Sequence, residues 1–143
     1  MTKPLLLQAR YRNKLERHVG DQLDAAGVSF DYEPSPLPYD VPARIAHYTP
    51  DFRPKDKQSG KHLHIILESK GYFIGGAKER QKYILFRNSH PELDVRFIFS
   101  NSSKPIYKGS KTTYGKWATD NGFKWCDKGT IPQAWLREMK GKQ

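Results

Sequence analysis

Two acidic residues and one lysine have a spacing that can support metal-dependent chemistry. Residues 48–52 read Tyr-Thr-Pro-Asp-Phe, and Glu68 and Lys70 follow on a segment, residues 62–70, that alternates like a β-strand. The alternation places Glu68 and Lys70 on one face, and the proline before Asp51 suits the start or edge of a neighbouring strand. If the strands pair, the three side chains converge. Two carboxylates can then hold a hard divalent cation while the lysine positions water or stabilises negative charge.

The alternative interpretation is a solvated Glu-x-Lys pair on a surface strand, which short motifs of this kind commonly are. The apolar run at residues 65–67 favours a buried strand instead. The histidines lack the spacing of metal ligands, and His62 and His64 read as surface or loop-end residues. The glycines Gly75 and Gly76 match no phosphate-binding loop, so no nucleotide cofactor is expected.

Positive charge is concentrated in the second half of the chain. Residues 1–69 carry ten Lys or Arg against nine Asp or Glu, whereas residues 70–143 carry fifteen against six. With aromatic residues interleaved among the lysines, this half is interpreted as a surface for a polyanion rather than as a device for solubility alone. The 143-residue length predicts one domain.

Cysteine content and hydropathy indicate the compartment. Cys126 is the sole cysteine in the sequence, which excludes an internal disulfide, fits a reducing environment and favours a small hydrophobic role. No apolar run approaches the roughly 20 residues of a membrane span. We therefore expect a soluble intracellular protein without a membrane partner.

The amino-terminal region combines a basic arm with an amphipathic helix. Residues 1–14 contain Lys and Arg but no acid, and are predicted to be mobile until they meet phosphate. Asn13 is a candidate cap for a helix whose apolar stripe ends at Gly27. Glu16 lies off that stripe, with helix capping as its alternative role.

A proline-rich connector follows the first predicted strand, residues 28–33. Residues 34–42 contain four prolines, which make the segment stiff and extended. Such a segment is not expected to fold back as a tight hairpin. It therefore suggests that the helix and first strand pack on a second copy of the chain, with an ordinary proline-rich loop as the alternative.

The remaining elements predict a mixed sheet. A helix over residues 77–88 and a strand over residues 94–100 complete a βαβ crossover, so these strands are expected to be parallel. A loop over residues 101–111 then offers a surface for phosphate around Tyr107, and its lysines are Lys104, Lys108 and Lys111. Shorter elements follow. Thr112 or Thr113 is a candidate cap for a short helix that runs through residues 117–121, and a strand over residues 123–126 and a helix opening at Pro132 come next. The tryptophans are interpreted as core anchors, with base stacking as the alternative: Trp117, Trp125 and Trp135.

With these elements in order, the chain resembles the phage endonuclease I family of Holliday-junction resolvases, within the Pro-Asp…Glu-x-Lys nuclease superfamily. The superfamily motif is loose, but the ordered set of segments is specific and covers nearly the whole chain. The segments that carry it are residues 14–16, 30–33, 48–52, 68–71, 90–94, 107–110, 113–115 and 131–135. The chain departs from the family in one place. The segment of residues 53–64, between Asp51 and Glu68, looks longer than the corresponding segment of the family.

The resemblance implies an α/β fold with a mixed, restriction-endonuclease-like central sheet flanked by helices, in a homodimer that exchanges its amino-terminal elements. Glu16 of one subunit would then join Asp51, Glu68 and Lys70 of the other as catalytic residues. The implied metal ligands are Asp51, Glu68, Glu16 and the Ser69 carbonyl, holding one or two Mg²⁺ or Mn²⁺ ions. The DNA contacts expected from the basic segments are Arg10, Arg12, Lys14, Arg17, Lys104, Lys108 and Lys111.

The activity implied is metal-dependent hydrolysis of phosphodiesters in four-way and other branched DNA, in the host cytoplasm if the protein is phage-encoded. Two other readings stay open. One is a sequence-specific or mismatch-type nuclease of the same superfamily, which would need a base-reading element. The other is a non-catalytic junction-binding module, which would bind DNA without nicking it.

Overall fold

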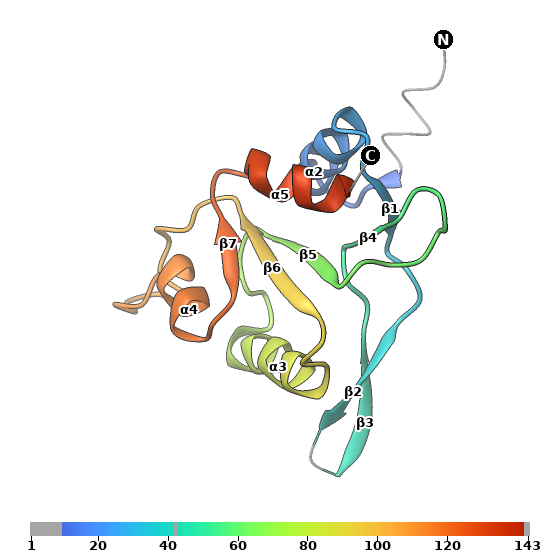
Figure 1. The fold of residues 1–143 in the computed structure, drawn as a ribbon. Helices are drawn as coiled ribbons and strands as arrows, with labels where there is room; N and C mark the ends of the chain where they lie inside the picture. Colours follow the sequence, from blue (N-terminus) through green and yellow to red (C-terminus); the bar gives the residue numbers. More distant parts are fainter. Residues whose placement is uncertain (1–9, 42, 142–143) are drawn as a thin grey trace.

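The structure is a computed structural model that describes residues 10–41 and 43–141. Most of the predicted basic arm, residues 1–9, therefore lies outside the described residues. The helices drawn in Figure 1 are α2 (Lys14–Ala25), α3 (Gly76–Ser89), α4 (Tyr114–Asp120) and α5 (Gln133–Lys140). The strands are β1 (Ser29–Tyr32), β2 (Leu37–Val41), β3 (Arg44–Tyr48), β4 (Phe52–Lys55), β5 (Ile65–Lys70), β6 (Asp94–Phe99) and β7 (Lys124–Cys126).

The main sheet is mixed, as predicted. Its strand order is β1-β4-β5-β6-β7. The first three strands pair antiparallel, whereas β5-β6 and β6-β7 are parallel. The βαβ prediction is confirmed, because α3 connects the parallel strands β5 and β6.

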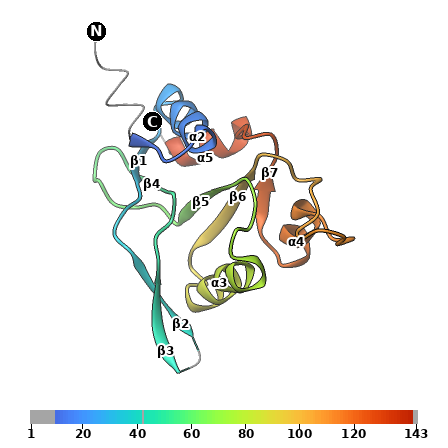
Figure 2. The same cartoon turned by 180° about the vertical axis from the view of Figure 1, so that it is seen from behind.

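Helices cover both faces of this sheet (Figure 1 and Figure 2). On β5, Ile65 and Leu67 pack with side chains from α2 and α5, whereas Ile66 packs with side chains from α3 and α4. The period-two alternation of the sequence therefore separates two apolar cores across one strand. Trp117 is buried in the second core, which confirms its interpretation as an anchor.

The start of α2 follows the predicted capping pattern. The Asn13 side chain accepts a hydrogen bond from the Glu16 backbone N–H at 2.8 Å. Further along α2, Gly20 leaves room for the ring of Tyr11, since a Cβ there would lie 2.2 Å from the tyrosine hydroxyl oxygen. The glycine thus fixes the segment that precedes α2 against the helix.

The proline-rich segment differs from the prediction. Residues 37–41 form β2, which pairs antiparallel with β3 in a ribbon that extends away from the main sheet (Figure 1). The expectation that this segment would not fold back as a hairpin is wrong, because each strand of a two-stranded ribbon has a free edge that accommodates proline. The turn between the strands holds Ala43 at a φ of +75°.

The carboxyl-terminal third completes the sheet edge. Thr113 caps α4 by accepting a hydrogen bond from the Lys116 backbone N–H at 3.2 Å. Cys126 on β7 is buried, and burial raises the pKa of its thiol to about 12. It packs in the core as a small apolar side chain. Within the described ranges, no helix has the length and apolar character required to cross a membrane.

Candidate active site

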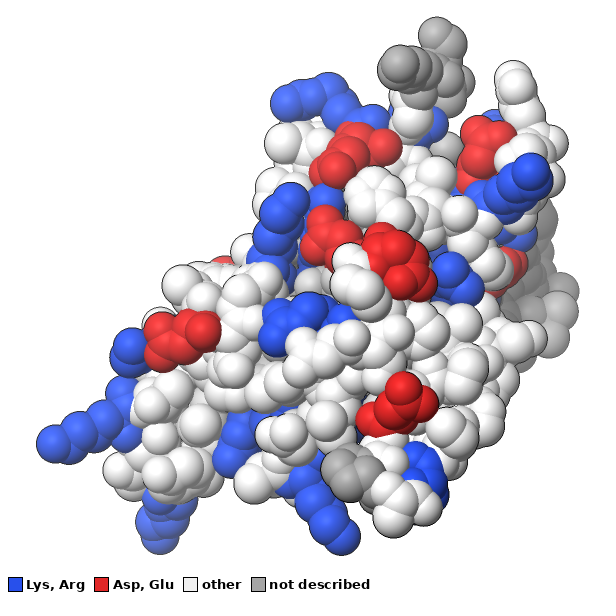
Figure 3. Space-filling view, turned by 60° about the horizontal axis from the view of Figure 1, so that its bottom comes forward, with Lys and Arg blue, Asp and Glu red and all other residues white. Residues whose placement is uncertain are grey.

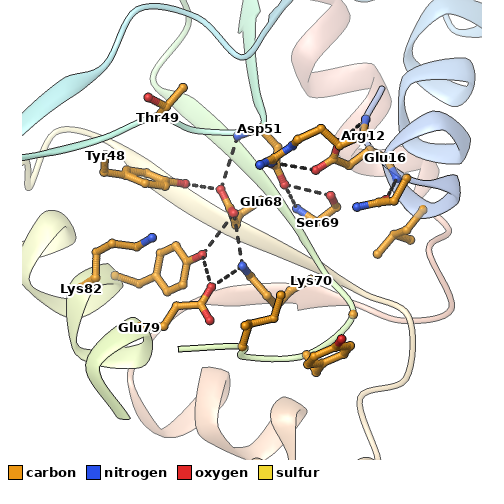
Figure 4. A pocket seen from close by; sticks show the side chains of 16 residues that line it. Arg12, Glu16, Tyr48, Thr49, Asp51, Glu68, Ser69, Lys70, Glu79 and Lys82 are labelled. Carbon is orange, nitrogen blue, oxygen red and sulfur yellow. Dashed lines mark hydrogen bonds and ion pairs between the residues drawn. The ribbon is translucent and has the colours of Figure 1, made fainter. Parts of the chain in front are cut away.

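The pairing of β4 with β5 brings the two predicted carboxylates together. Phe52, the first residue of β4, lies opposite Leu67 in antiparallel register. Asp51 immediately before it therefore meets Glu68 immediately after Leu67, and the Asp51 N–H lies 3.4 Å from a Glu68 carboxylate oxygen. Both side chains are buried, in a cleft that Figure 4 shows from close by.

Asp51 is held by donors on both of its carboxylate oxygens. The Ser69 N–H and hydroxyl donate to one oxygen at 3.0 and 2.9 Å, and the Arg12 guanidinium donates to the other at 2.9 Å. Burial, with the nearby Glu68 and Glu16 carboxylates, nevertheless raises the pKa of Asp51 well above its usual range. The site therefore carries an excess of negative charge that a bound cation would relieve.

Glu68 is oriented by two tyrosines. The hydroxyls of Tyr48 and Tyr83 donate to its two oxygens, the Tyr83 bond measuring 3.1 Å. Burial and the Glu68 charge raise the pKa of both phenols well above their usual range, so both stay protonated donors at neutral pH. They fix the direction in which Glu68 presents its charge.

Lys70 shares the cleft with Glu68, as the strand alternation predicted. Its ammonium lies 3.6 Å from Glu68 and 2.5 Å from Glu79, which projects from the first turns of α3. Burial alone lowers the pKa of a lysine, but these two carboxylates outweigh burial, and the pKa of Lys70 is raised. Lys70 is therefore a charged donor, fit to orient an anion rather than to act as a base.

Glu16 reaches the same cleft from α2 of the same chain. Its carboxylate accepts hydrogen bonds from Tyr32 and from the backbone N–H of Arg12, the latter at 3.1 Å. One Arg12 nitrogen bridges Glu16 and Asp51 at 2.9 Å each, and another lies 2.8 Å from Glu33. A single chain thus brings together all four residues predicted to be catalytic: Glu16, Asp51, Glu68 and Lys70.

In this structure the carboxylate oxygens of the site accept hydrogen bonds from groups of the protein. Within residues 10–41 and 43–141, no three His, Cys, Asp or Glu side chains are gathered as ready metal ligands. Arg12 instead bridges Glu16 and Asp51, at the position that a bound cation would take. Buried carboxylate oxygens in excess of the available positive charge are the donors that a hard divalent ion takes. The residues therefore fit such an ion, provided that Arg12 moves aside.

The predicted DNA contacts lie at four places in the structure. Arg12 belongs to the catalytic cleft, and Arg10 packs its guanidinium 5.0 Å from the ring centre of Phe30. Lys14 and Arg17 are exposed on α2, and a further exposed set lies on the loop between β6 and α4: Lys104, Lys108 and Lys111. Figure 3 shows Lys and Arg side chains projecting from the edges of one face of the molecule.

Sequence reasoning missed Glu79, Tyr48, Tyr83 and the role of Arg12. Tyr83 lies four residues after Glu79, so the two share one face of α3, but nothing in a single helix indicates that this face meets Glu68. Arg12 and Glu16 are also four residues apart, so the sequence alone could have indicated that these two side chains pair. The position of Ser69 as a donor to Asp51 was not predicted either.

Comparisons with known proteins identify relatives of this chain. The sequence profile described as Phage endonuclease I matches residues 2–143. Endonuclease I of Escherichia phage T7 is 40% identical over 130 residues, covering 91% of this chain and 80% of the relative. Endodeoxyribonuclease 1 of Enterobacteria phage T3 is 40% identical over 130 residues, covering 91% of this chain and 79% of the relative.

A divalent cation should stabilise the folded protein through Asp51. At about ten times its dissociation constant, an ion that binds only the folded state contributes about 1.4 kcal/mol, which raises Tm by several degrees. Thermal unfolding with Mg²⁺ or Mn²⁺ should show this increase in the wild type and lose it in Asp51→Asn. The matched control Asp120→Asn changes an exposed carboxylate and should keep it. An equal increase in Asp51→Asn would place the ion elsewhere.

Proposed function

The chain belongs to the phage endonuclease I family, and we propose that it is a structure-selective endodeoxyribonuclease that resolves four-way and other branched DNA junctions. The observation that carries this proposal is the convergence of Asp51, Glu68 and Lys70 in one cleft of a chain that the family matches over residues 2–143. Both relatives are phage proteins by name, which supports action in the cytoplasm of a bacterial host.

Hydrolysis depends on one or two Mg²⁺ or Mn²⁺ ions in this proposal. The ligands would be Asp51, Glu68, Glu16 and the carbonyl oxygen of Ser69. When bound, such an ion supplies an activated water and stabilises charge on the scissile phosphate. The raised pKa of Asp51 supports the assignment, because burial beside Glu68 and Glu16 makes a carboxylate that favours a cation.

The residues of the chain orient the reacting groups. Lys70, kept protonated by Glu68 and Glu79, presents an ammonium to a phosphate oxygen in the cleft. Tyr48 and Tyr83 hold the Glu68 carboxylate in one direction. Arrangements of this kind lower the barrier because the donors are fixed before the substrate arrives.

Binding of the DNA backbone is assigned to the basic residues around the cleft. Arg12 is exposed over 63% of its side chain, so its guanidinium can turn from Asp51 to a phosphate and release the carboxylates. Exposed lysines and arginines on α2 and on the loop after β6 extend this surface. They read the shape of a junction through its phosphates, and affinity should fall steeply with salt.

A homodimer would present two such sites to a junction and cut two opposed strands. We further propose that the subunits exchange α2 and β1, so that Glu16 enters the cleft of the partner. Ala43 at the tip of the β2–β3 ribbon adopts a left-handed φ, which is unfavourable for a residue with a Cβ. Opening of that turn would relieve this strain and let α2 and β1 move to a partner with β2 carried along, which favours exchange.

The wild type should cleave a four-way junction in Mg²⁺ faster than a linear duplex of the same sequence. Asp51→Asn and Lys70→Ala should each slow cleavage by about 100-fold or more yet keep junction affinity, since the phosphate-binding surface is intact. Gel assays of cleavage and binding measure both, with the exposed Lys116→Ala as control. Equal cleavage rates on the two substrates would contradict the proposed selectivity for junctions. A wild-type cleavage rate in either site variant would show that the residue is not catalytic.

Glu79 is expected to act through Lys70. Glu79→Gln should lower the cleavage rate by about 10- to 100-fold, the usual cost of losing a group that orients a functional residue, without changing junction affinity. The control Glu92→Gln alters an exposed glutamate near the other end of α3 and should cleave normally. A normal rate in Glu79→Gln would show that Lys70 is held adequately without it.

Mixed subunits test the exchange. If Glu16 enters the partner's cleft, subunits with Glu16→Gln combined with subunits with Lys70→Ala form heterodimers that have one intact site, and nicking should return. If Glu16 serves its own chain, both sites of the heterodimer are defective and nicking stays absent. The assay requires co-refolding of the two variants, with each variant alone as the control.

A further inference from the structure

Two tyrosines stand exposed beside the catalytic cleft. Among the described residues, the exposed large hydrophobic side chains are Ile45, Tyr72, Ile74 and Tyr107. Tyr72 is 58% exposed and Tyr107 is 61% exposed, although most aromatic rings of the described chain are packed in the two cores. Exposed rings close to a functional site commonly mark a binding surface.

Both tyrosines line one groove. The groove has a volume of about 360 Å³, within the range of small-ligand sites, and Lys104, Lys108 and Ile106 line it as well. Tyr72 also lines the catalytic cleft. The groove and the cleft therefore adjoin, with Tyr72 as their shared wall.

The groove rests on a fixed base. The rings of Phe73 and Tyr114 stack at 4.8 Å, and the Phe73 N–H donates to the Tyr114 hydroxyl at 2.7 Å. The Ile106 N–H donates to the Thr112 carbonyl at 2.9 Å, which closes the loop that carries Tyr107. A ligand would meet rings presented by ordered backbone, so little conformational entropy is lost on binding.

Cations flank both rings. The Lys104 ammonium lies 5.3 Å from the ring centre of Tyr72, and the Arg80 guanidinium lies 5.9 Å from that of Tyr107. Aromatic faces interleaved with Lys and Arg are the combination that binds single-stranded nucleic acid, because a base stacks on the ring while a cation meets its phosphate. Charge complementarity therefore favours a nucleotide over an apolar protein segment.

We propose that this groove binds one unstacked nucleotide of the DNA, adjacent to the strand held in the catalytic cleft; the inference rests on the proposed function. In a continuous duplex the faces of each base are covered by its neighbours, so the tyrosines have nothing to stack on. A branch point offers bases with a free face. The groove thus gives the protein a means to prefer branched over linear DNA that the phosphate contacts alone do not supply.

The test measures DNA binding by variants of Tyr107, which lines the groove but not the catalytic cleft, in a Lys70→Ala background that keeps the DNA uncut. Tyr107→Ala should weaken binding to a four-way junction by about tenfold, within the range of base–aromatic stacking, and leave linear-duplex affinity unchanged. Tyr107→Phe keeps the ring and should bind the junction like the parent. Unchanged linear-duplex affinity also verifies that the variant is folded.

A second readout locates the base. Junctions carrying 5-iodouracil at each position flanking the branch point should crosslink to Tyr72 or Tyr107 on irradiation, as identified by mass spectrometry of the peptide. The proposal is overturned if Tyr107→Ala binds the junction like the parent, if it weakens binding to the junction and to the linear duplex equally, or if no crosslink reaches either tyrosine. Failure of the parent protein to prefer junctions at all would instead contradict the proposed function.

Discussion

Three carboxylates, those of Glu16, Asp51 and Glu68, are buried around one cleft, and their mutual repulsion is the constraint on which the site depends. Two like charges about 4 Å apart near a protein surface repel by about 4 kcal/mol, so this cluster requires compensation. Arg12 forms ion pairs with Glu16 and Asp51, and protonated tyrosines together with Lys70 contact Glu68. The same imbalance that makes the site costly to bury makes it receptive to a cation.

The position of the central residues follows from the sequence because it depends on local rules. The alternation along residues 62–70 fixed the faces of β5, and the proline before Asp51 marked the start of β4. Antiparallel pairing of the two strands then brings Asp51 beside Glu68. What local rules cannot supply is which face of α3 meets the cleft, since that depends on packing across the sheet. Glu79 was missed for this reason.

The β2–β3 ribbon illustrates a different limit. The prolines of residues 34–42 predicted an extended backbone, which residues 37–41 adopt as β2. An extended backbone is compatible with a connector and with a strand, and pairing is decided by the partner segment. The ribbon carries the left-handed Ala43 at its turn and packs Tyr39 against Phe86 of α3. The ribbon therefore packs on α3, whereas α2 and β1, which precede it, pack directly on the main sheet.

The central claim is that Asp51 and Glu68 share a divalent cation. Anomalous diffraction from crystals of the protein grown with Mn²⁺ tests it most directly. The account predicts a peak within bonding distance of a carboxylate oxygen of each residue, with the Arg12 guanidinium displaced from Asp51. A peak that touches only one of the two carboxylates, or an Arg12 that keeps its bridge in the presence of a bound ion, would contradict it.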